Sequence, residues 1–220
     1  MNFFKGKKRM YDYIFFDLDG TLTEPAEGIC NSFVYALKKY GIETADKSVY
    51  FRYIGPPLYD SFREHLPEEQ IEEAIRYFRE YFNEKGKFEN EVYPGVPELL
   101  AELKQMGKTL ILCTSKYELF ARQIVEHFSL DKFFDFIAGA SADESRSEKE
   151  DVIRYACSEL GITDLSKAVM VGDRKFDIMG GKTCGLDTLG VLYGYGSLEE
   201  LKAAGATNIA ATVRDILKFV

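Results

Sequence analysis

The sequence predicts an α/β protein, with a Rossmann-like doubly wound parallel sheet as its core and a small α-helical domain inserted after the first strand. Three observations predict this fold. Five apolar runs recur along the chain, helical patterns alternate with them, and segment 22–92 interrupts the alternation with helical patterns only. Strand–helix alternation is typical of doubly wound sheets, and 220 residues are enough for such a core with an insert.

The expected strands are nearly continuous in apolar residues. Parallel strands that are covered by helices on both faces need such continuity, because neither face of the strand meets water. The runs are YIFFD (13–17), TLILCT (109–114), FFDFIAG (133–139), AVMVGD (168–173) and LDTLGVLY (186–193).

Core helices are expected between these strands, where apolar residues repeat every three or four positions. In the first of them, Val96, Leu99 and Leu103 share one face, and Gly107 follows as a stop signal. We expect core helices over 96–106, 120–128 and 152–160.

Segment 22–92 contains helical patterns but no strong strand. In its second half, Ile71, Ile75 and Phe78 form an apolar stripe opposite Glu and Arg residues. Such a segment between the first two strands indicates an inserted helical domain. We expect its helices at 29–41 and 67–82, joined by the aromatic stretch 50–62, and the core at 1–21 and 93–220.

The composition limits the partners of this chain. A net charge of −8 disfavours nucleic acid polymers and anionic membranes, whereas a small phosphorylated molecule needs only local positive charge. The basic start, MNFFKGKKRM, precedes a short apolar run that ends at Asp17, so we expect neither a signal peptide nor a membrane span there. We interpret this start as a frayed end or part of the first strand, and we expect a cytoplasmic protein. The four cysteines lack metal-binding spacing, and none of them resembles a structural disulfide partner, which fits a reducing compartment.

Three polar residues, Asp17, Thr114 and Asp173, each close a different expected strand. Ligands of open α/β sheets bind outside the carboxyl ends of the strands, so these side chains should converge at one edge. The carboxylate oxygens of Asp17 and Asp173 suit Mg²⁺ better than a soft metal. Gly20 allows the chain to turn, so that Asp17 and Asp19 can face one substrate.

A pair of carboxylates at such an edge can carry out phosphoryl transfer. One carboxylate can attack phosphorus and form an aspartyl-phosphate, while a second protonates the leaving oxygen and later activates water. Mg²⁺ and a lysine would offset the repulsion between these acids and a phosphate dianion. We therefore expect a small phosphorylated metabolite as substrate and Mg²⁺ as cofactor.

The run DLDGT (17–21) resembles the first motif of the haloacid-dehalogenase-like (HAD) phosphohydrolases. Thr114 is similar to their second motif, Lys149 is placed like their third-motif lysine, and VGDRKFD (171–177) resembles their fourth motif. Segment 22–92 is similar to a C1-type cap. The order of motifs and the IGPPL run in this segment are most similar to the phosphoglycolate phosphatase and 5′-nucleotidase branch.

The resemblance implies a Mg²⁺-dependent phosphatase with Asp17 as nucleophile and Asp19 as general acid and base. Asp177 would be an auxiliary acid. Mg²⁺ would be held by Asp17, Asp173 and the backbone carbonyl of Asp19. The implied phosphate-binding residues are Thr114, Ser115, Lys149 and Gly20.

Several of these residues also have a purely structural interpretation. The DLDGT run alone could be a strand end and turn, and Thr114 could be a β-branched strand residue. Lys149 lies in a charged run that could be a solvated loop, and Lys116 and Arg146 are rivals for its role. Asp177 could be an acid favoured by the helix dipole in a first helical turn.

Three functions are compatible with this constellation. The first is a phosphatase. The second is a sugar-phosphate phosphomutase, which would need the insert to exclude water. The third is a phospho-accepting signalling domain, which would need neither Asp19 nor the insert. The insert would select the substrate through candidate residues such as Arg52 and Tyr59, and we expect a monomer or a homodimer.

Overall fold

The computed structural model describes residues 11–143 and 145–220, which form two compact units. One, the α/β unit, contains residues 11–23 and Val92–Val220. The other, the helical unit, is the continuous segment Glu24–Glu91. The basic start that we expected to be a frayed end or part of the first strand lies outside the described residues.

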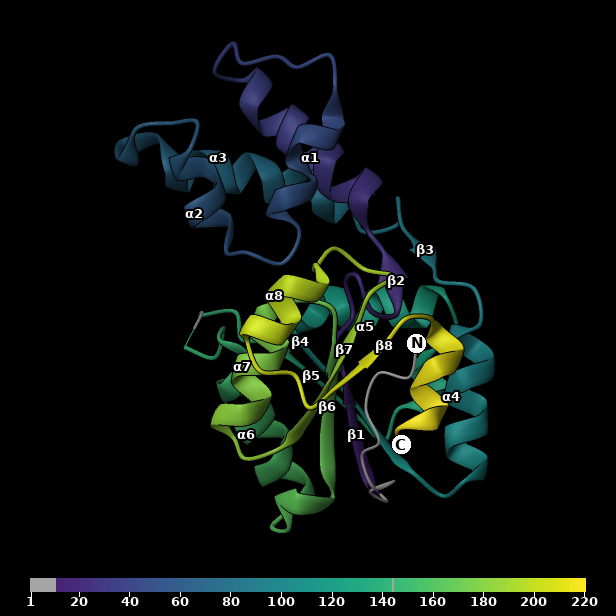
Figure 1. The fold of residues 1–220 in the computed structure, drawn as a ribbon. Coiled ribbons are helices and arrows are strands. Elements are labelled where there is room, and N and C mark those ends of the chain that lie inside the picture. Colours follow the sequence, from purple (N-terminus) through teal and green to yellow (C-terminus); the bar gives the residue numbers. More distant parts are fainter. Residues whose placement is uncertain (1–10, 144) are drawn as a thin grey trace. The chain divides into compact units, whose positions relative to one another are not determined.

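A six-stranded sheet forms the middle of the α/β unit (Figure 1). Its strands are β1 (Tyr13–Phe16), β4 (Thr109–Tyr117), β5 (Phe136–Ala140), β6 (Ala168–Gly172), β7 (Asp187–Val191) and β8 (Asn208–Ala210). The strand order is β5-β4-β1-β6-β7-β8, and every neighbouring pair is parallel. The doubly wound parallel sheet predicted from the sequence is confirmed.

Helices cover both faces of this sheet. They are α4 (Val96–Gln105), α5 (Glu118–His127), α6 (Lys149–Leu160), α7 (Lys175–Thr183) and α8 (Leu198–Ala203), with short 3-10 segments η3 (Asp131–Phe133), η4 (Leu165–Lys167) and η5 (Val213–Lys218). The chain runs outward from β1 to β4 and β5, then returns to β6 and β7. Right-handed crossovers therefore place α4 and α5 on one face, and α6 and α7, which contact each other, on the opposite face.

The strands are apolar because helices bury their side chains. On the α6 side, Phe15 of β1 and Met170 of β6 lie in one fully buried cluster with Val152 and Ala156 of α6. Burying a large apolar side chain such as Phe15 contributes about 1.5–3 kcal/mol relative to leaving it exposed. The first ionisable side chain after this core is that of Asp17, directly beyond the carboxyl end of β1.

Some element ends differ from those predicted. β4 runs on to Tyr117, past the expected end at Thr114, with an irregular register over its last residues. β5 begins only at Phe136, because η3 forms a separate turn before it. α6 begins at Lys149, so this residue belongs to a helix and not to a solvated loop. β8 was not predicted, because a three-residue strand shows no recognisable periodicity.

The helical unit has an aromatic core. Its elements are α1 (Ala26–Lys38), η1 (Lys47–Tyr53), α2 (Leu58–Arg63), α3 (Glu68–Tyr81) and η2 (Phe82–Gly86). The ring of Phe33 lies 4.9–5.5 Å from the rings of Tyr50, Tyr53, Phe62 and Phe78. Stretch 50–62 supplies three of these rings, so much of it is core, and α2 occupies most of its second half.

Two short strands, β2 (Thr23–Glu24) and β3 (Glu91–Val92), lie where the chain passes between the units. They pair with each other in a separate two-stranded sheet. Within 11–143 and 145–220, no helix combines the length and apolar character that crossing a membrane requires.

Candidate active site

The carboxyl end of β1 lies where the winding of the sheet changes direction. Phe16 of β1 pairs with Leu112 of β4 on one side and with Val171 of β6 on the other. The backbone N–H of Asp17 donates a 2.9 Å hydrogen bond to the carbonyl of Val171. Open α/β sheets bind ligands at such a switch point, so Asp17 lies where a ligand is expected.

The chain turns directly after Leu18. The N–H groups of residues 21–23 all donate to the carbonyl of Leu18, at 2.9–3.2 Å. Gly20 has a φ of +79°, and a Cβ there would lie 2.3 Å from Oδ2 of Asp173. The N–H of Gly20 donates to the carbonyl of Thr23 at 2.8 Å. Gly20 therefore makes the turn, and its expected contact with a phosphate stays a prediction.

The ammonium group of Lys149 joins three segments of the site. Its Nζ lies 2.9 Å from Oδ1 of Asp17, 2.8 Å from Oδ1 of Asp177 and 3.0 Å from the carbonyl oxygen of Cys113. The two carboxylate oxygens are buried and have no further hydrogen-bond donor among the described residues. Burial lowers the pKa of Lys149, but Asp17 and Asp177 together raise it above its ordinary value, so the lysine is charged.

Three carboxylates lie close together at this site, and two of them pair with Lys149. One oxygen from each of Asp17, Asp173 and Asp177 lies within 4.8 Å of the other two. Oδ2 of Asp173 accepts a 2.8 Å hydrogen bond from the N–H of Tyr195, and Oδ2 of Asp177 accepts one of 3.0 Å from the N–H of Arg174. Asp177 thus caps the start of α7 and also belongs to the carboxylate cluster.

The cluster fits a divalent cation. Burial, with the charges of Asp177 and Asp17, raises the pKa of Asp173 well above its ordinary range. Burial also raises the pKa of Asp177 to about 6, against the opposing effect of Lys149. Shifts in this direction mean that the ionised carboxylates are disfavoured unless a further cation shares the site. Closely spaced, hard carboxylate oxygens are the donors that Mg²⁺ prefers.

Asp19 pairs with a different lysine. Nζ of Lys116 lies 2.9 Å from Oδ2 of Asp19, and the two side chains are only 9% and 16% exposed. Oδ1 of Asp19 is buried and has no hydrogen-bond partner in the part of the chain that is described. Burial raises the pKa of Asp19, although Lys116 lowers it. A carboxyl with one oxygen held and one unengaged is suited to proton transfer.

The two expected phosphate-binding residues of β4 differ in exposure. Thr114 is 2% exposed, and its Oγ1 accepts a 3.2 Å hydrogen bond from the N–H of Lys116. Ser115, the next residue, is exposed. Both lie just beyond Cys113, whose carbonyl binds Lys149, so β4 brings them to the edge of the sheet that carries Asp17.

Arg146, one of the rivals of Lys149, is engaged elsewhere. Its guanidinium donates to Glu118 at 2.9 Å and to the carbonyl of Gly139 at 2.8 Å. It also lies over the ring of Tyr155, 3.7 Å from the centroid. These contacts tie the segment before α6 to β5, and Lys149 is the residue that pairs with Asp17.

Arg52 and Tyr59, the candidate specificity residues, belong to the helical unit. The guanidinium of Arg52 donates to the hydroxyl of Tyr53 at 2.6 Å and pairs with Glu64 at 2.5 Å. The hydroxyl of Tyr59, on α2, donates to Glu68 at 3.1 Å. Their role in selecting a substrate stays a prediction.

Two features of the site were not predicted. One is the ion pair between Lys116 and Asp19. These residues are almost a hundred positions apart in the sequence, and no local pattern predicts that they pair. The other is segment Tyr193–Gly196, which contacts Asp173. Tyrosine and glycine alternate in this segment directly after a strand. This pattern could have predicted the contact, because glycine in or next to a strand often marks a place where another backbone approaches closely.

Comparison with known families agrees with this geometry. A family model described as haloacid dehalogenase-like hydrolase matches residues 14–191. The chain belongs to this family. The resemblance expected from the DLDGT run and the later motifs is confirmed, and so is the expectation of an enzyme of the HAD phosphohydrolase type.

Three relatives of this HAD hydrolase illustrate the range of activities. A protein named 5′-nucleotidase from Pseudomonas aeruginosa is 41% identical over 203 residues, which cover 91% of both chains. A protein named tyrosine-protein kinase PtkA from Mycobacterium tuberculosis is 38% identical over 92% of this chain and 70% of its own length. A predicted phosphatase from Clostridium acetobutylicum, known from its crystal structure, is 48% identical in sequence. The two structures match with a TM-score of 0.90 over 95% of this chain and 97% of the other.

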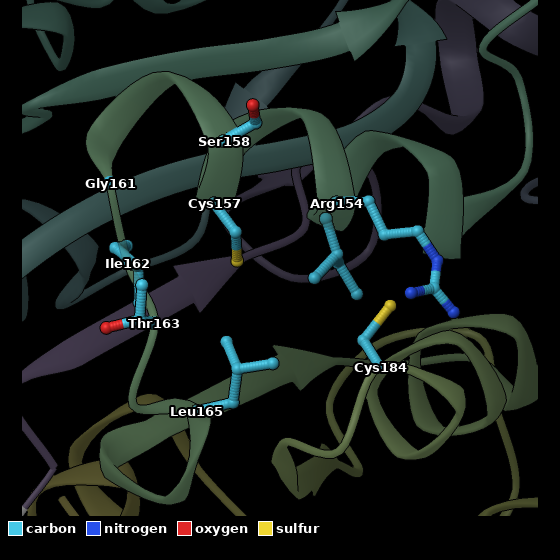
Figure 2. A pocket seen from close by; sticks show the side chains of 9 residues that line it. Arg154, Cys157, Ser158, Gly161, Ile162, Thr163, Leu165 and Cys184 are labelled. Carbon is cyan, nitrogen blue, oxygen red and sulfur yellow. The ribbon is translucent and has the colours of Figure 1, made fainter.

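A separate cavity of about 400 Å³ lies beside α6, and its lining side chains are drawn in Figure 2. It is formed by the carboxyl-terminal part of α6, the turn after it and Cys184, which follows α7. Burial raises the pKa of Cys157 to about 11, and it also raises that of Cys184, so both thiols in this cavity keep their protons. None of the candidate catalytic residues lines it.

Proposed function

We propose that this HAD hydrolase is a Mg²⁺-dependent phosphatase that hydrolyses a small phosphorylated metabolite, phosphoglycolate-like or nucleotide-like, through an aspartyl-phosphate on Asp17. The observation that carries the proposal is the position of Asp17 at the switch point, 2.9 Å from Lys149 and beside Asp173. The residues proposed as the nucleophile, as the cation for phosphoryl oxygens and as metal ligands thus lie close together.

In the first half-reaction, a carboxylate oxygen of Asp17 would attack the phosphorus, and the bond from phosphorus to the leaving oxygen would break. Asp19 would give its proton to that leaving oxygen. The direction of the shift in the pKa of Asp19, which burial raises, supports this role, because a raised pKa makes a carboxyl hold its proton more tightly. The products of this step are the leaving alcohol and an acyl phosphate on Asp17.

In the second half-reaction, water would attack the phosphorus of the acyl phosphate. Asp19, now ionised, would take a proton from this water, and the bond between phosphorus and the Asp17 oxygen would break. Inorganic phosphate leaves, and both carboxyl groups return to their starting states. Lys149, Thr114 and Ser115 would hold the phosphoryl oxygens through both steps.

Asp17 and Asp173 would hold Mg²⁺ together with the backbone carbonyl of Asp19, and Asp177 would support the cluster as an auxiliary acid. Bound Mg²⁺ would supply positive charge to the phosphoryl oxygens. Lys149 pairs with both Asp17 and Asp177, so it would keep these carboxylates apart and oriented whether or not substrate is present.

Two further observations support a small metabolite as the substrate. The relative named 5′-nucleotidase matches this chain over nearly its whole length. The net charge of −8 disfavours polymeric nucleic acid and anionic membranes as partners. We expect the enzyme to act in the cytoplasm as a monomer or a homodimer.

The test is phosphate release from a panel of phosphorylated metabolites. Phosphoglycolate, nucleoside 5′-monophosphates and hexose phosphates would be compared with Mg²⁺ and with a chelator. We expect release from at least one of the first two classes, dependent on Mg²⁺ and absent in Asp17→Asn. Release that continues unchanged in chelator, or in Asp17→Asn, would contradict the proposal.

The relative named tyrosine-protein kinase supports a second candidate, phosphoryl transfer to a tyrosine hydroxyl. In that reaction the phosphoryl group would pass from Asp17 to the tyrosine oxygen, and Asp19 would take the hydroxyl proton. Labelled ATP with a tyrosine peptide would reveal it as label on the peptide. Interconversion of hexose phosphate isomers would instead indicate a mutase, and an acyl phosphate that persists without turnover would indicate a signalling domain.

A further inference from the structure

Segment Tyr193–Gly196, which connects β7 to α8, lies directly against Asp173. The N–H of Tyr195 donates a 2.8 Å hydrogen bond to Oδ2 of Asp173. Asp173 is fully buried, so this backbone donor replaces water that the carboxylate has lost. The direction of one lone pair of Oδ2 is therefore set by the path of this segment.

The two glycines of the segment allow the close approach. A Cβ at Gly196 would lie 1.9 Å from the carbonyl oxygen of Asp173, and a Cβ at Gly194 would lie 2.3 Å from the carbonyl oxygen of Gly20. Neither position has room for a side chain unless the backbone moves. Tyr195 can reach Asp173 only because both of its neighbours lack a Cβ.

Both ends of the segment are anchored. At the front, the hydroxyl of Tyr193 donates a 2.9 Å hydrogen bond to the carbonyl of Thr21, and its ring meets that of Tyr93 edge-on at 5.1 Å. Burial raises the pKa of Tyr193, so the phenol keeps the proton that it donates. At the back, Arg174, the residue after Asp173, donates a 2.9 Å hydrogen bond from its Nε to Glu200 of α8.

Tyr193 acts on Asp173 along two short routes. The hydroxyl of Thr21 lies 3.4 Å from Oδ1 of Asp173, as a long hydrogen bond, so holding the backbone of Thr21 also holds this donor. Tyr193 also fixes the start of the segment in which Tyr195 donates to Oδ2. Tyr193 is thus bound through its hydroxyl to one residue that donates to Asp173, Thr21, and lies two positions before the other donor, Tyr195.

We propose that Tyr193–Gly196 is a positioning element that orients the Asp173 carboxylate for Mg²⁺, and that Tyr193 is its positioning residue. This inference rests on the proposed function, because that function assigns Asp173 to Mg²⁺. Groups that hold a metal ligand typically affect metal affinity about 10–100-fold when they are removed. A tyrosine that served only to stabilise the fold would leave that affinity unchanged.

The test compares Tyr193→Phe with a matched control, Tyr11→Phe. Tyr11 is buried in the same unit, and its hydroxyl donates a hydrogen bond of the same length, 2.9 Å, to Asp187 at the start of β7. Both variants keep the ring and lose one hydroxyl. Mg²⁺ affinity would be measured by isothermal titration calorimetry without substrate, and thermal midpoints would report any loss of stability.

We expect Tyr193→Phe to weaken Mg²⁺ binding by about 10-fold, while its kcat at saturating Mg²⁺ changes little. Tyr11→Phe should lower the thermal midpoint to a similar extent and bind Mg²⁺ as the wild type does. Thr21→Val, which removes the hydroxyl facing Oδ1, should weaken binding in the same direction and gives a second measurement should Tyr193→Phe fold poorly.

Equal Mg²⁺ affinity in Tyr193→Phe, Thr21→Val and the wild type would overturn the inference and leave the proposed phosphatase intact. A wild-type protein that binds Mg²⁺ but releases no phosphate from any substrate would instead overturn the proposed function, and the affinities would still decide the inference. A wild-type protein that binds no Mg²⁺ overturns the inference outright.

Discussion

Oδ1 of Asp17 and Nζ of Lys149 lie 2.9 Å apart, and the lysine side chain is 3% exposed. The proposed nucleophile therefore shares a nearly dry environment with a fixed positive charge, and that charge also reaches Asp177. In such surroundings the attraction is stronger than in water, and losing either partner is costly.

Lys149→Met should therefore affect both activity and stability. We expect kcat to fall by about 10²–10³-fold, as when one preorganised donor to a developing charge is removed. We also expect a loss of about 3–5 kcal/mol in the free energy of unfolding, because the buried carboxylates lose their partner. Steady-state kinetics and urea unfolding would measure the two effects.

The control is Lys167→Met, which removes an exposed pair with Asp12 at 3.1 Å. It should change neither quantity appreciably. A Lys149→Met enzyme with wild-type kcat would show that Lys149 has no part in the chemistry.

Asp17→Asn and Asp19→Asn should differ in where the reaction stops. An amide is a poor nucleophile, so Asp17→Asn should form no acyl phosphate. Asp19→Asn should slow both formation and hydrolysis of the acyl phosphate, by about 10²–10⁴-fold. Rapid quenching with ³²P-labelled substrate separates the two steps, and Asp12→Asn serves as an exposed control. Labelled protein in Asp17→Asn would place the nucleophile elsewhere.

The response of the thermal midpoint to Mg²⁺ should grow with pH. A carboxyl whose folded-state pKa is raised stabilises the fold at low pH, and this contribution is lost as pH rises through the folded pKa. For Asp177 this window runs from about 4, the ordinary value, to about 6, and the shift of Asp173 acts in the same direction. The metal-free protein should thus lose this contribution across the window, and Mg²⁺, which binds the ionised form, should restore it.

Differential scanning fluorimetry with Mg²⁺ or chelator at pH 5, 6 and 7.5 measures this. We expect the smallest Mg²⁺ effect at pH 5 and the largest at pH 7.5. Asp173→Asn removes one charge of the cluster, so it should stabilise the metal-free protein at pH 7.5 and abolish the Mg²⁺ response. An Mg²⁺ effect that is equal at the three pH values would contradict the role of these carboxyls.

Gly180 lies beneath Lys149 and should not tolerate a methyl group. A Cβ there would lie 2.7 Å from Cβ of Lys149, so Gly180→Ala should displace the lysine and lower kcat. Gly181→Ala is a matched control on the same helix, because its Cβ would meet Cγ2 of Thr188 at 2.7 Å, away from the lysine. It should cost about 1–3 kcal/mol of stability through overpacking with kcat retained. Equal kcat in the two variants would refute the argument.

Arg52→Ala and Tyr59→Ala should reorder the substrates of the enzyme. Core residues are proposed to hold the phosphoryl group, so the helical unit should act on the leaving group and leave a small aryl phosphate little affected. Relative kcat/KM across the metabolite panel is the measurement. Arg76→Ala, which breaks an exposed pair with Glu73 on α3, is the control. If the order of substrates stays as in the wild type, these residues do not select the substrate.

The sequence predicted the elements whose signal is local. β1, β4 and β6 are continuous apolar runs, and Asp17 and Asp173 directly follow two of them, so their convergence could be deduced from the rule for parallel sheets. The turn at Gly20 was also predictable, since a positive φ favours glycine.

The unpredicted features depend on contacts between distant segments. Thr21 meets Asp173 across 152 positions, and Tyr193 meets Thr21 across 172. Nothing in the neighbourhood of either residue encodes such a partner. The burial of Lys149 was hidden in the same way, because the charges around it in the sequence resemble a solvated surface while its own side chain turns inward.

The chain leaves the α/β unit at β2 and returns to it at β3. These two strands pair with each other, and each has only two residues. Within the helical unit, the N–H of Gly28 donates to the carbonyl of Glu89, which closes the two ends of the insert on each other. A gene for such a protein can exchange this module by recombination without disturbing the register of β1 or β4.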